Sequence, residues 1–178
     1  KIWLSEIMLQ QTRVKTVIPY YQRWVNAFPN INSVAMASTE SLLKMWEGLG
    51  YYARVRNFHF ACQIVMNQYS GKVPDSAELL LTLPGVGPYI SSAIMSIAFH
   101  RSVPAMDSNA LRVVSRLKTM GGSLFVRKKK ILGVLSDIIC NQRLRAPTTD
   151  LYASIGNFTN IALSQYFRPF NHAPATSD

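Results

Sequence analysis

The stretch Leu83-Pro84-Gly85-Val86-Gly87-Pro88-Tyr89 decides the fold of this chain, because it places a turn with two glycines between two segments of helical pattern. The proline at position 84 interrupts the first segment, and the glycines tolerate positive φ and a close approach to the backbone. Unpaired N–H groups at the start of the second helix favour an anion such as a phosphate. The stretch predicts a tight hairpin between two helices, with an ordinary glycine-rich turn as the alternative.

The rest of the chain also reads as helical. Alternating strand patterns are essentially absent, and short turns with glycine, proline or asparagine separate the helical segments, so we expect an all-α protein. The expected helices cover 5–28 with a break near Pro19, 39–46, 54–69, 76–83, 89–99, 108–118, 127–141 and 151–163. In the second hairpin helix, one buried face is expected from the spacing of Ile90, Ile94, Ile97 and Ala98.

Composition and charge indicate the class of partner. The chain has 178 residues, 48% of them hydrophobic, which suits one or two small domains with a substantial core. Lys and Arg outnumber Asp and Glu by 19 to 9, for a formal charge of +10, as expected of a surface that meets a polyanion. Anionic membranes or acidic proteins would also satisfy this balance. No apolar run approaches the roughly 20 residues of a membrane span and no signal-peptide pattern opens the chain, so we expect an intracellular protein without a membrane partner.

Three motifs in order carry a family resemblance. The hairpin followed by Asp107 resembles the helix-hairpin-helix DNA glycosylases of the endonuclease III superfamily. Within it, Ser5-Glu6-Ile7-Met8-Leu9-Gln10-Gln11-Thr12 and Gly48-Leu49-Gly50-Tyr51-Tyr52-Ala53-Arg54 are similar to the adenine DNA glycosylase branch. The resemblance runs from residue 1 to about residue 156. It implies a six-helix-barrel lobe over 1–100, with the helix-hairpin-helix at about 76–99, and a second helical lobe over 101–178.

Glu6 is the first candidate for catalysis. It stands among Trp3, Leu4, Ile7 and Met8, and a carboxyl in a partly desolvated pocket is suited to deliver a proton. Local sequence alone leaves an exposed carboxylate near a helix start as an equal alternative. The resemblance implies that Glu6 is the general acid, which protonates adenine at N7.

Asp107 and Asn109 are the next candidates. The run Asp107-Ser108-Asn109 before an apolar helical pattern also reads as a simple N-cap, and both roles are compatible. The resemblance implies that Asp107 stays ionised to stabilise positive charge on the sugar, a division of labour known for paired carboxyls. Asn109 is implied as a hydrogen-bonding residue of the active site.

Tyr89 separates two mechanisms. Bifunctional relatives place a lysine at this position, whose amine forms a Schiff base and leads to strand cleavage. A phenol cannot form that imine, so Tyr89 favours base removal alone, with an aromatic residue that packs at a helix start as the alternative.

Extrusion of a base from the stack costs a few kcal/mol, which inserted side chains partly offset. The resemblance implies insertion near the mispair by Gln11 and Tyr51, with Leu9 and Gln10 beside them, although local evidence alone reads Tyr51 as half-buried packing. Candidate phosphate contacts are Arg13, Lys15, Arg54 and Arg56, and the hairpin contributes Gly85, Val86 and Gly87. Asp150 falls where relatives carry a polar residue near the flipped adenine.

The resembled family commonly holds an iron–sulfur cluster on four cysteines. This chain has only Cys62 and Cys140, both among apolar residues and without metal-ligand spacing, so neither a cluster nor another metal is expected. The family's separate domain for recognising 8-oxoguanine has no counterpart in these residues, and the sequence is compatible with a fragment.

The predicted function is a monofunctional DNA N-glycosylase, acting as a monomer on double-stranded DNA, that removes adenine mispaired with 8-oxoguanine or guanine. A thymine glycosylase for T:G mismatches is an alternative on the same scaffold, whereas Tyr89 disfavours a bifunctional oxidised-pyrimidine enzyme. A non-catalytic DNA-binding module is the alternative of a different class.

Overall fold

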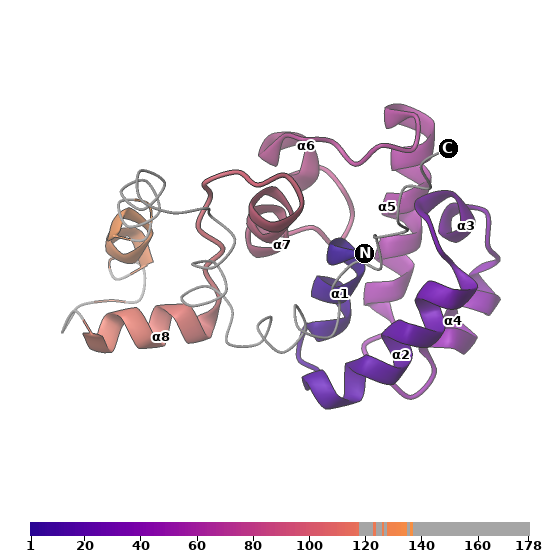
Figure 1. Ribbon diagram of the computed structural model, residues 1–178, viewed down its shortest axis with the longest axis horizontal. Coiled ribbons are helices and arrows are strands. Elements are labelled where there is room, and N and C mark those ends of the chain that lie inside the picture. Colours follow the sequence, from indigo (N-terminus) through magenta and orange to yellow (C-terminus); the bar gives the residue numbers. More distant parts are fainter. Residues whose placement is uncertain (118–122, 124–125, 127, 135, 137–178) are drawn as a thin grey trace, which may run out of the picture.

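The computed structural model describes residues 1–117, 123, 126, 128–134 and 136, and these residues are helical without any strand. The helices, shown in Figure 1, are α1 (Ile2–Leu9), α2 (Val14–Ala27), α3 (Ile31–Ala35), α4 (Thr39–Trp46), α5 (Ala53–Tyr69), α6 (Ala77–Leu81), α7 (Pro88–Ala93), the π-helix η1 (Ile94–Ala98) and α8 (Ser108–Leu117). Helix α4 has the bounds expected from the sequence. The expected helix over 151–163 and most of that over 127–141 lie outside the described residues.

The break in the first expected helix was placed wrongly. Helix α1 ends at Leu9, and Gln11 in the following turn has a φ of 54°. The helical structure is therefore interrupted between Leu9 and Val14 and not at Pro19. Helix α2 continues through Pro19, which is exposed. Water can bond the carbonyl group that a proline leaves unpaired on an exposed face, which keeps this interruption tolerable.

Helix α3 was not expected from the sequence, although a local signal for it exists. The side chain of Asn30 accepts a hydrogen bond from the Ser33 amide at 2.8 Å, and the Ser33 hydroxyl accepts one from the Asn30 amide at 3.2 Å. This reciprocal capping satisfies two donors at a helix start. It positions a five-residue helix that packs on α5.

The second hairpin helix changes type halfway. After α7 the backbone widens into η1, where the Phe99 amide bonds to the Ile94 carbonyl at 3.3 Å. The wider turn shifts the buried face, so Met95 and Ser96 are buried whereas Ala98 is exposed. The expectation that Ala98 shares a buried face with Ile90 and Ile94 is therefore wrong, because it assumed an unbroken α-helical period.

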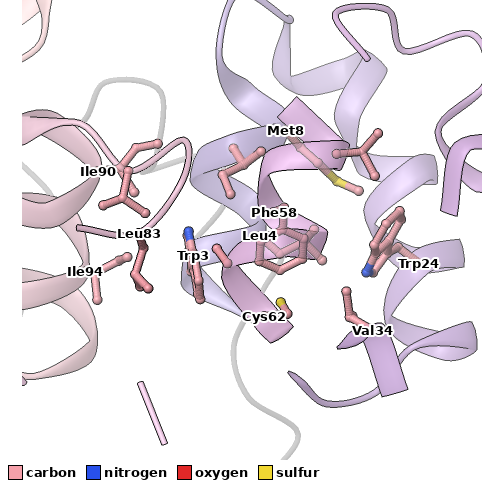
Figure 2. Packing of buried hydrophobic residues seen from close by; sticks show 14 of the residues in the cluster. Trp3, Leu4, Met8, Trp24, Val34, Phe58, Cys62, Leu83, Ile90 and Ile94 are labelled. Carbon is pink, nitrogen blue, oxygen red and sulfur yellow. The ribbon is translucent and has the colours of Figure 1, made fainter. Parts of the chain in front are cut away.

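The main core is formed where α1 lies between α5 and the hairpin. Figure 2 shows the indole of Trp3 between Leu83 of the hairpin and Phe58 of α5, and its ring meets that of Phe58 edge-on at 5.1 Å. Ile94 packs in the same cluster. Helix α1 also contacts α2, so nearly all of its side chains are buried. A helix with apolar residues all round is suited to the interior of a domain.

A second, smaller cluster joins Val114 of α8 to Ile131, with Met106 and Leu111 packed against it. Along the long axis of the molecule, α7 lies between α8 and α5 (Figure 1). A division into lobes at residue 100 stays a prediction. Within the described part of the chain, no helix combines the length and apolar character that a bilayer span requires.

Candidate active site and DNA-contacting surface

Glu6 lies in the interior of the protein. It is the fifth residue of α1, and only 3% of its surface is exposed. The neighbours of α1 are α2, α5, α7 and η1, which surround it on most sides. The alternative of an exposed carboxylate is therefore wrong, because α1 is buried almost completely. A general-acid role for Glu6 stays a prediction.

The hairpin is held by local and long-range bonds. The hydroxyl of Ser76 caps α6 by accepting a hydrogen bond from the Leu79 amide at 3.3 Å. The Val86 amide donates to the Leu83 carbonyl at 3.1 Å, and the Ser91 hydroxyl donates to the Ala77 carbonyl at 3.3 Å. These bonds close the turn between α6 and α7. Val86 is buried and its amide is paired within the hairpin.

The two hairpin glycines meet different requirements. Gly85 has a φ of 77°, and a Cβ atom there would stand 2.9 Å from the Cβ of Asn57 on α5. Gly87 has a φ of −90°, and nothing lies within 4 Å of the position of a Cβ atom. Both glycines tolerate positive φ, and of the two only Gly85 adopts it. The open space at Gly87 is what a close approach by a ligand would need.

Tyr89 is the second residue of α7. It is half-buried and packs against the main core. The contact between α1 and α7 brings the helix of Tyr89 against the helix of Glu6. Packing and a catalytic role remain compatible for this residue.

Asp107 directly precedes α8, and its carbonyl oxygen accepts a hydrogen bond from the Leu111 amide at 3.0 Å. It is half-buried at the beginning of the helix, as the N-cap interpretation predicts. Asn109 is the second residue of α8, and its side chain lies outside the described structure. Asp150 also lies outside the described residues.

The two residues expected to insert into DNA share an uncommon backbone conformation. Gln11 has a φ of 54° and Tyr51 a φ of 51°, both in the left-handed region that non-glycine residues rarely adopt. Both side chains are exposed, that of Tyr51 by 60%. Leu9 and Gln10 are partly buried beside Gln11. Strained backbone of this kind clusters at functional sites.

The side chain of Arg54 connects these two segments. Its guanidinium donates to carbonyl oxygens at the end of α1 and in the loop before α5. Burial lowers the pKa of the Arg54 guanidinium, and the neighbouring Tyr51 offsets part of this effect. A phosphate contact by Arg54 stays a prediction, and the protein itself supplies other partners for the guanidinium. Sequence reasoning missed this role, because the bonded carbonyls of α1 lie more than 40 positions away.

Exposed cations are the remaining candidates for phosphate contact. Arg13, Lys15 and Arg56 are exposed, Arg13 and Lys15 at the start of α2 and Arg56 on the first turn of α5. Such side chains position a protein on a nucleic acid without reading its sequence.

The chain does not fit a four-cysteine iron–sulfur cluster. Such a cluster requires four thiolates, and only two cysteines are present. Cys62 is fully buried, and burial raises the pKa of its thiol to about 12, which opposes the thiolate form. Cys140 lies outside the described residues. Among the described side chains, no group of three or more His, Cys, Asp or Glu is arranged to hold a metal ion.

These features define the class of protein. The sequence profile of the family described as "HhH-GPD superfamily base excision DNA repair protein" matches residues 4–132. The chain belongs to this family.

Curated proteins similar to this chain include adenine DNA glycosylases. That of Rattus norvegicus is 45% identical over 121 residues, which cover 67% of this chain and 23% of the relative. That of Buchnera aphidicola subsp. Acyrthosiphon pisum (strain APS) is 37% identical over 139 residues, covering 77% of this chain and 40% of the relative. The chain thus spans less than half the length of these relatives.

Solved structures confirm the fold. A trapped endonuclease III–DNA covalent intermediate superimposes with a TM-score of 0.66 at 22% identity, over 82% of this chain and 76% of the other. A thermostable thymine-DNA glycosylase superimposes with a TM-score of 0.67 at 19% identity, over 88% and 82%. The prediction of an all-α, endonuclease III-like fold is confirmed.

Proposed function

We propose that this protein is a DNA glycosylase of base excision repair that removes adenine mispaired with 8-oxoguanine or guanine. It acts on double-stranded DNA inside the cell as a monomer. The observation that carries the proposal is Glu6, a carboxyl group of which only 3% is exposed, within the residues 4–132 that match the base excision repair family. The proposal takes the substrate from the names of the similar adenine DNA glycosylases.

Glu6 acts as the general acid. Adenine leaves poorly as an anion, so a proton delivered to N7 as the bond from C1′ to N9 breaks allows it to leave neutral. Water then adds to C1′ and loses a proton, which completes hydrolysis.

Asp107 acts beside the sugar as the second carboxylate. As the glycosidic bond breaks, positive charge develops on the ring, and a nearby carboxylate lowers the energy of that state. Asn109 contributes a hydrogen bond in the same site. Asp150 is proposed near the flipped adenine.

Tyr89 makes the enzyme monofunctional. Strand cleavage through a Schiff base needs an amine, and the phenol of Tyr89 supplies none. The product is therefore an abasic site in an intact strand, and Tyr89 assists near the sugar.

DNA binds across the hairpin and the exposed cations. Gly85, Val86 and Gly87 shape the hairpin, and the open space at Gly87 admits a phosphate oxygen to the backbone. Arg13, Lys15 and Arg56 contact further phosphates. Gln11 and Tyr51 insert beside the mispair, supported by Leu9 and Gln10, as adenine leaves the stack.

The test is a single-turnover assay on labelled duplexes with A opposite 8-oxoguanine, A opposite G, or T opposite G, each developed with and without alkali. Strand breaks at adenine only after alkali are expected. Breaks at thymine would assign the protein to the thymine glycosylases, and breaks without alkali would contradict the monofunctional mechanism. Tight binding without excision would indicate a non-catalytic DNA-binding protein.

The same preparation tests the proposal that no iron–sulfur cluster is needed. Iron analysis of the active protein should find no stoichiometric iron. A cluster-like absorbance that rises with activity would contradict it.

A further inference from the structure

Arg54 bonds to the end of the helix that carries Glu6. Its Nη1 atom lies 3.0 Å from the Ile7 carbonyl oxygen, 2.9 Å from that of Met8 and 2.6 Å from that of Gln10. The last carbonyls of an α-helix have no partner within the helix, and they form the negative end of its dipole. A guanidinium group at this place supplies hydrogen-bond donors to these carbonyls and a positive charge at the negative end of the dipole. It therefore anchors the C-terminal end of α1.

The same guanidinium bonds to the loop before α5. Its Nη2 atom lies 3.1 Å from the Gly50 carbonyl oxygen and 3.4 Å from that of Leu49, and Nε lies 3.4 Å from the Tyr51 carbonyl oxygen. Nη2 also donates to the Thr12 hydroxyl at 3.3 Å. One planar group thus joins two turns that are about 40 positions apart in the sequence.

A buried aromatic ring supports this arrangement. The guanidinium carbon lies 5.3 Å from the ring centroid of Trp46, which is fully buried, and 5.3 Å from that of Tyr51. The indole N–H of Trp46 donates to the Gly50 carbonyl at 2.9 Å, so the two donors share this oxygen. A cation over an aromatic ring together with a fork of donors to several carbonyls is a combination that arginine provides and lysine does not.

The two joined turns contain the strained residues. Gln11 follows the bonded Gln10 carbonyl directly, and Tyr51 follows that of Gly50. Left-handed backbone at residues with a Cβ atom persists only when the surrounding structure restrains it. The bonds of Arg54 lie on the residues next to both positions.

We propose that Arg54 is a positioning residue that holds Gln11 and Tyr51 together as one rigid pair, ready to enter DNA beside the mispair. The inference rests on the proposed function. If two loops had to become ordered when DNA binds, the entropy lost would weaken binding to DNA with the base extruded. A preformed pair avoids this cost. Arg54 acts through these residues and needs no contact with DNA.

The test compares Arg54→Lys with the wild-type protein on two substrates. One is a duplex with A opposite 8-oxoguanine, and the other has A opposite an abasic site, where the base is already poorly paired. Lysine keeps the charge but loses the fork. We expect single-turnover excision on the paired duplex to slow by about tenfold or more, which corresponds to about 1.4 kcal/mol. On the abasic-site duplex the rate should recover to within a few-fold of wild type, because less insertion is required there.

Arg23→Lys is the matched control. Arg23 also donates to a backbone carbonyl, that of Met45 at 3.2 Å, and lies over the ring of Tyr20 at 4.8 Å, but it is exposed and bonds to one segment only. It should match wild type on both substrates. If Arg54→Lys equals wild type on both substrates, or is slowed equally on both, the positioning role is wrong.

A second variant tests the proposal if Arg54→Lys does not fold. Thr12→Val removes one acceptor of the guanidinium, together with the bond of 3.2 Å from the Thr12 hydroxyl to the Gln10 carbonyl, and leaves Arg54 in place. It should show the same difference between the two substrates with a smaller amplitude. If Arg54→Lys does not fold, and Thr12→Val changes the excision rate relative to wild type by the same factor on both substrates, the proposal is overturned.

A fluorescence measurement separates this inference from the proposed function. 2-Aminopurine is placed next to a mispair whose adenosine carries a 2′-fluoro group, which blocks excision. Insertion unstacks the reporter, so the wild-type protein should raise its emission and Arg54→Lys should not. If the wild-type protein excises no base, the proposed function fails, and this signal alone then decides the role of Arg54: equal signals for both proteins would overturn it.

Discussion

At the scale of single residues, the end of α1 separates two environments within five positions. Glu6 is buried, whereas Gln11 is exposed in a left-handed turn. Burial suits a group that must hold and deliver a proton, and exposure suits a group that must meet DNA. The change occurs because α1 ends between them and the chain turns outward.

Replacement of the two carboxylates tests their assigned chemistry. Glu6→Gln removes the proposed proton donor, and Asp107→Asn removes the carboxylate proposed beside the sugar. We expect each to slow single-turnover excision of adenine by about 100-fold or more, since general acids contribute about 10²–10⁴-fold. DNA affinity, measured by fluorescence anisotropy at matched salt, should stay close to wild type.

Glu40→Gln is the control for Glu6→Gln, because Glu40 is an exposed carboxylate on α4. It should leave the excision rate unchanged. A nearly full rate in Glu6→Gln or Asp107→Asn would remove that residue from the mechanism.

The two hairpin glycines should respond differently to alanine. In Gly85→Ala the new Cβ meets Asn57 and the backbone keeps a positive φ, so we expect a loss of about 2 kcal/mol in the free energy of unfolding. In Gly87→Ala the Cβ enters open space and the backbone is ordinary. A weaker N-cap and a less flexible unfolded chain offset each other, so its stability should change by only about 0.5 kcal/mol.

Gly87→Ala should weaken DNA binding more than it changes the free energy of unfolding. The added methyl group occupies the space proposed for a phosphate, so affinity should fall by about tenfold, or about 1.4 kcal/mol, although the protein stays folded. Thermal unfolding and anisotropy titrations measure both effects. Unchanged affinity in a stable Gly87→Ala protein would exclude a close phosphate contact at this glycine.

At the scale of helices, ends and irregular turns decide what each segment presents. Helix α3 owes its start to the reciprocal bonds of Asn30 and Ser33, and α2 tolerates Pro19 on an exposed face. The π-helix η1 turns Met95 and Ser96 inward, next to α1. These irregularities place side chains where an unbroken helical period would not.

The cap of α3 allows a test with an internal control. Asn30→Ala removes the acceptor for the Ser33 amide, and a lost N-cap costs about 1 kcal/mol. Asn32→Ala changes an exposed residue within the same helix and should cost much less. Urea unfolding should show a lower midpoint for Asn30→Ala with an unchanged slope. Equal midpoints for the two variants would mean that the cap does not hold α3.

At the scale of the whole molecule, one core joins segments from α1 to the hairpin. Trp3 packs against both α5 and the hairpin, so the helix with Glu6 moves only if the core is repacked. The net charge of +10 is suited to DNA, but charge alone does not choose a substrate. The rigidity of the core is what positions the charged groups.

Two buried acids make unfolding depend on pH. Burial raises the pKa of Cys62 to about 12 and that of Tyr21 to about 12, compared with about 8.5 and about 10 in an unfolded chain. The folded state therefore favours the protonated forms. Their contribution is complete below about pH 8.5 and is lost as pH rises toward about 12, because the unfolded chain releases these protons first.

The free energy of unfolding, measured with urea at pH 8 to 11, should thus fall with rising pH. Cys62→Ala and Tyr21→Phe should each flatten this fall, whatever they cost at neutral pH. Lysines that ionise in this range contribute equally to all three proteins. Identical slopes in wild type and both variants would show that neither group loses a proton preferentially on unfolding.

Local interactions allowed much of the fold to be predicted. The bounds of α4, the hairpin and the start of α8 follow from caps, prolines and apolar spacing, which act within a few residues. The signal for α3 was also local, in Asn30 and Ser33, but was not recognised.

By itself, the sequence determined an all-helical chain of strong positive charge, with a glycine hairpin and candidate carboxylates at Glu6 and Asp107. Only the tertiary structure decided that Glu6 is buried and that Gly87 borders open space. It also decided that Arg54 bonds to two distant turns. The physical reason is that burial and long-range hydrogen bonds depend on which helices pack together, and no residue carries that information in its near neighbours.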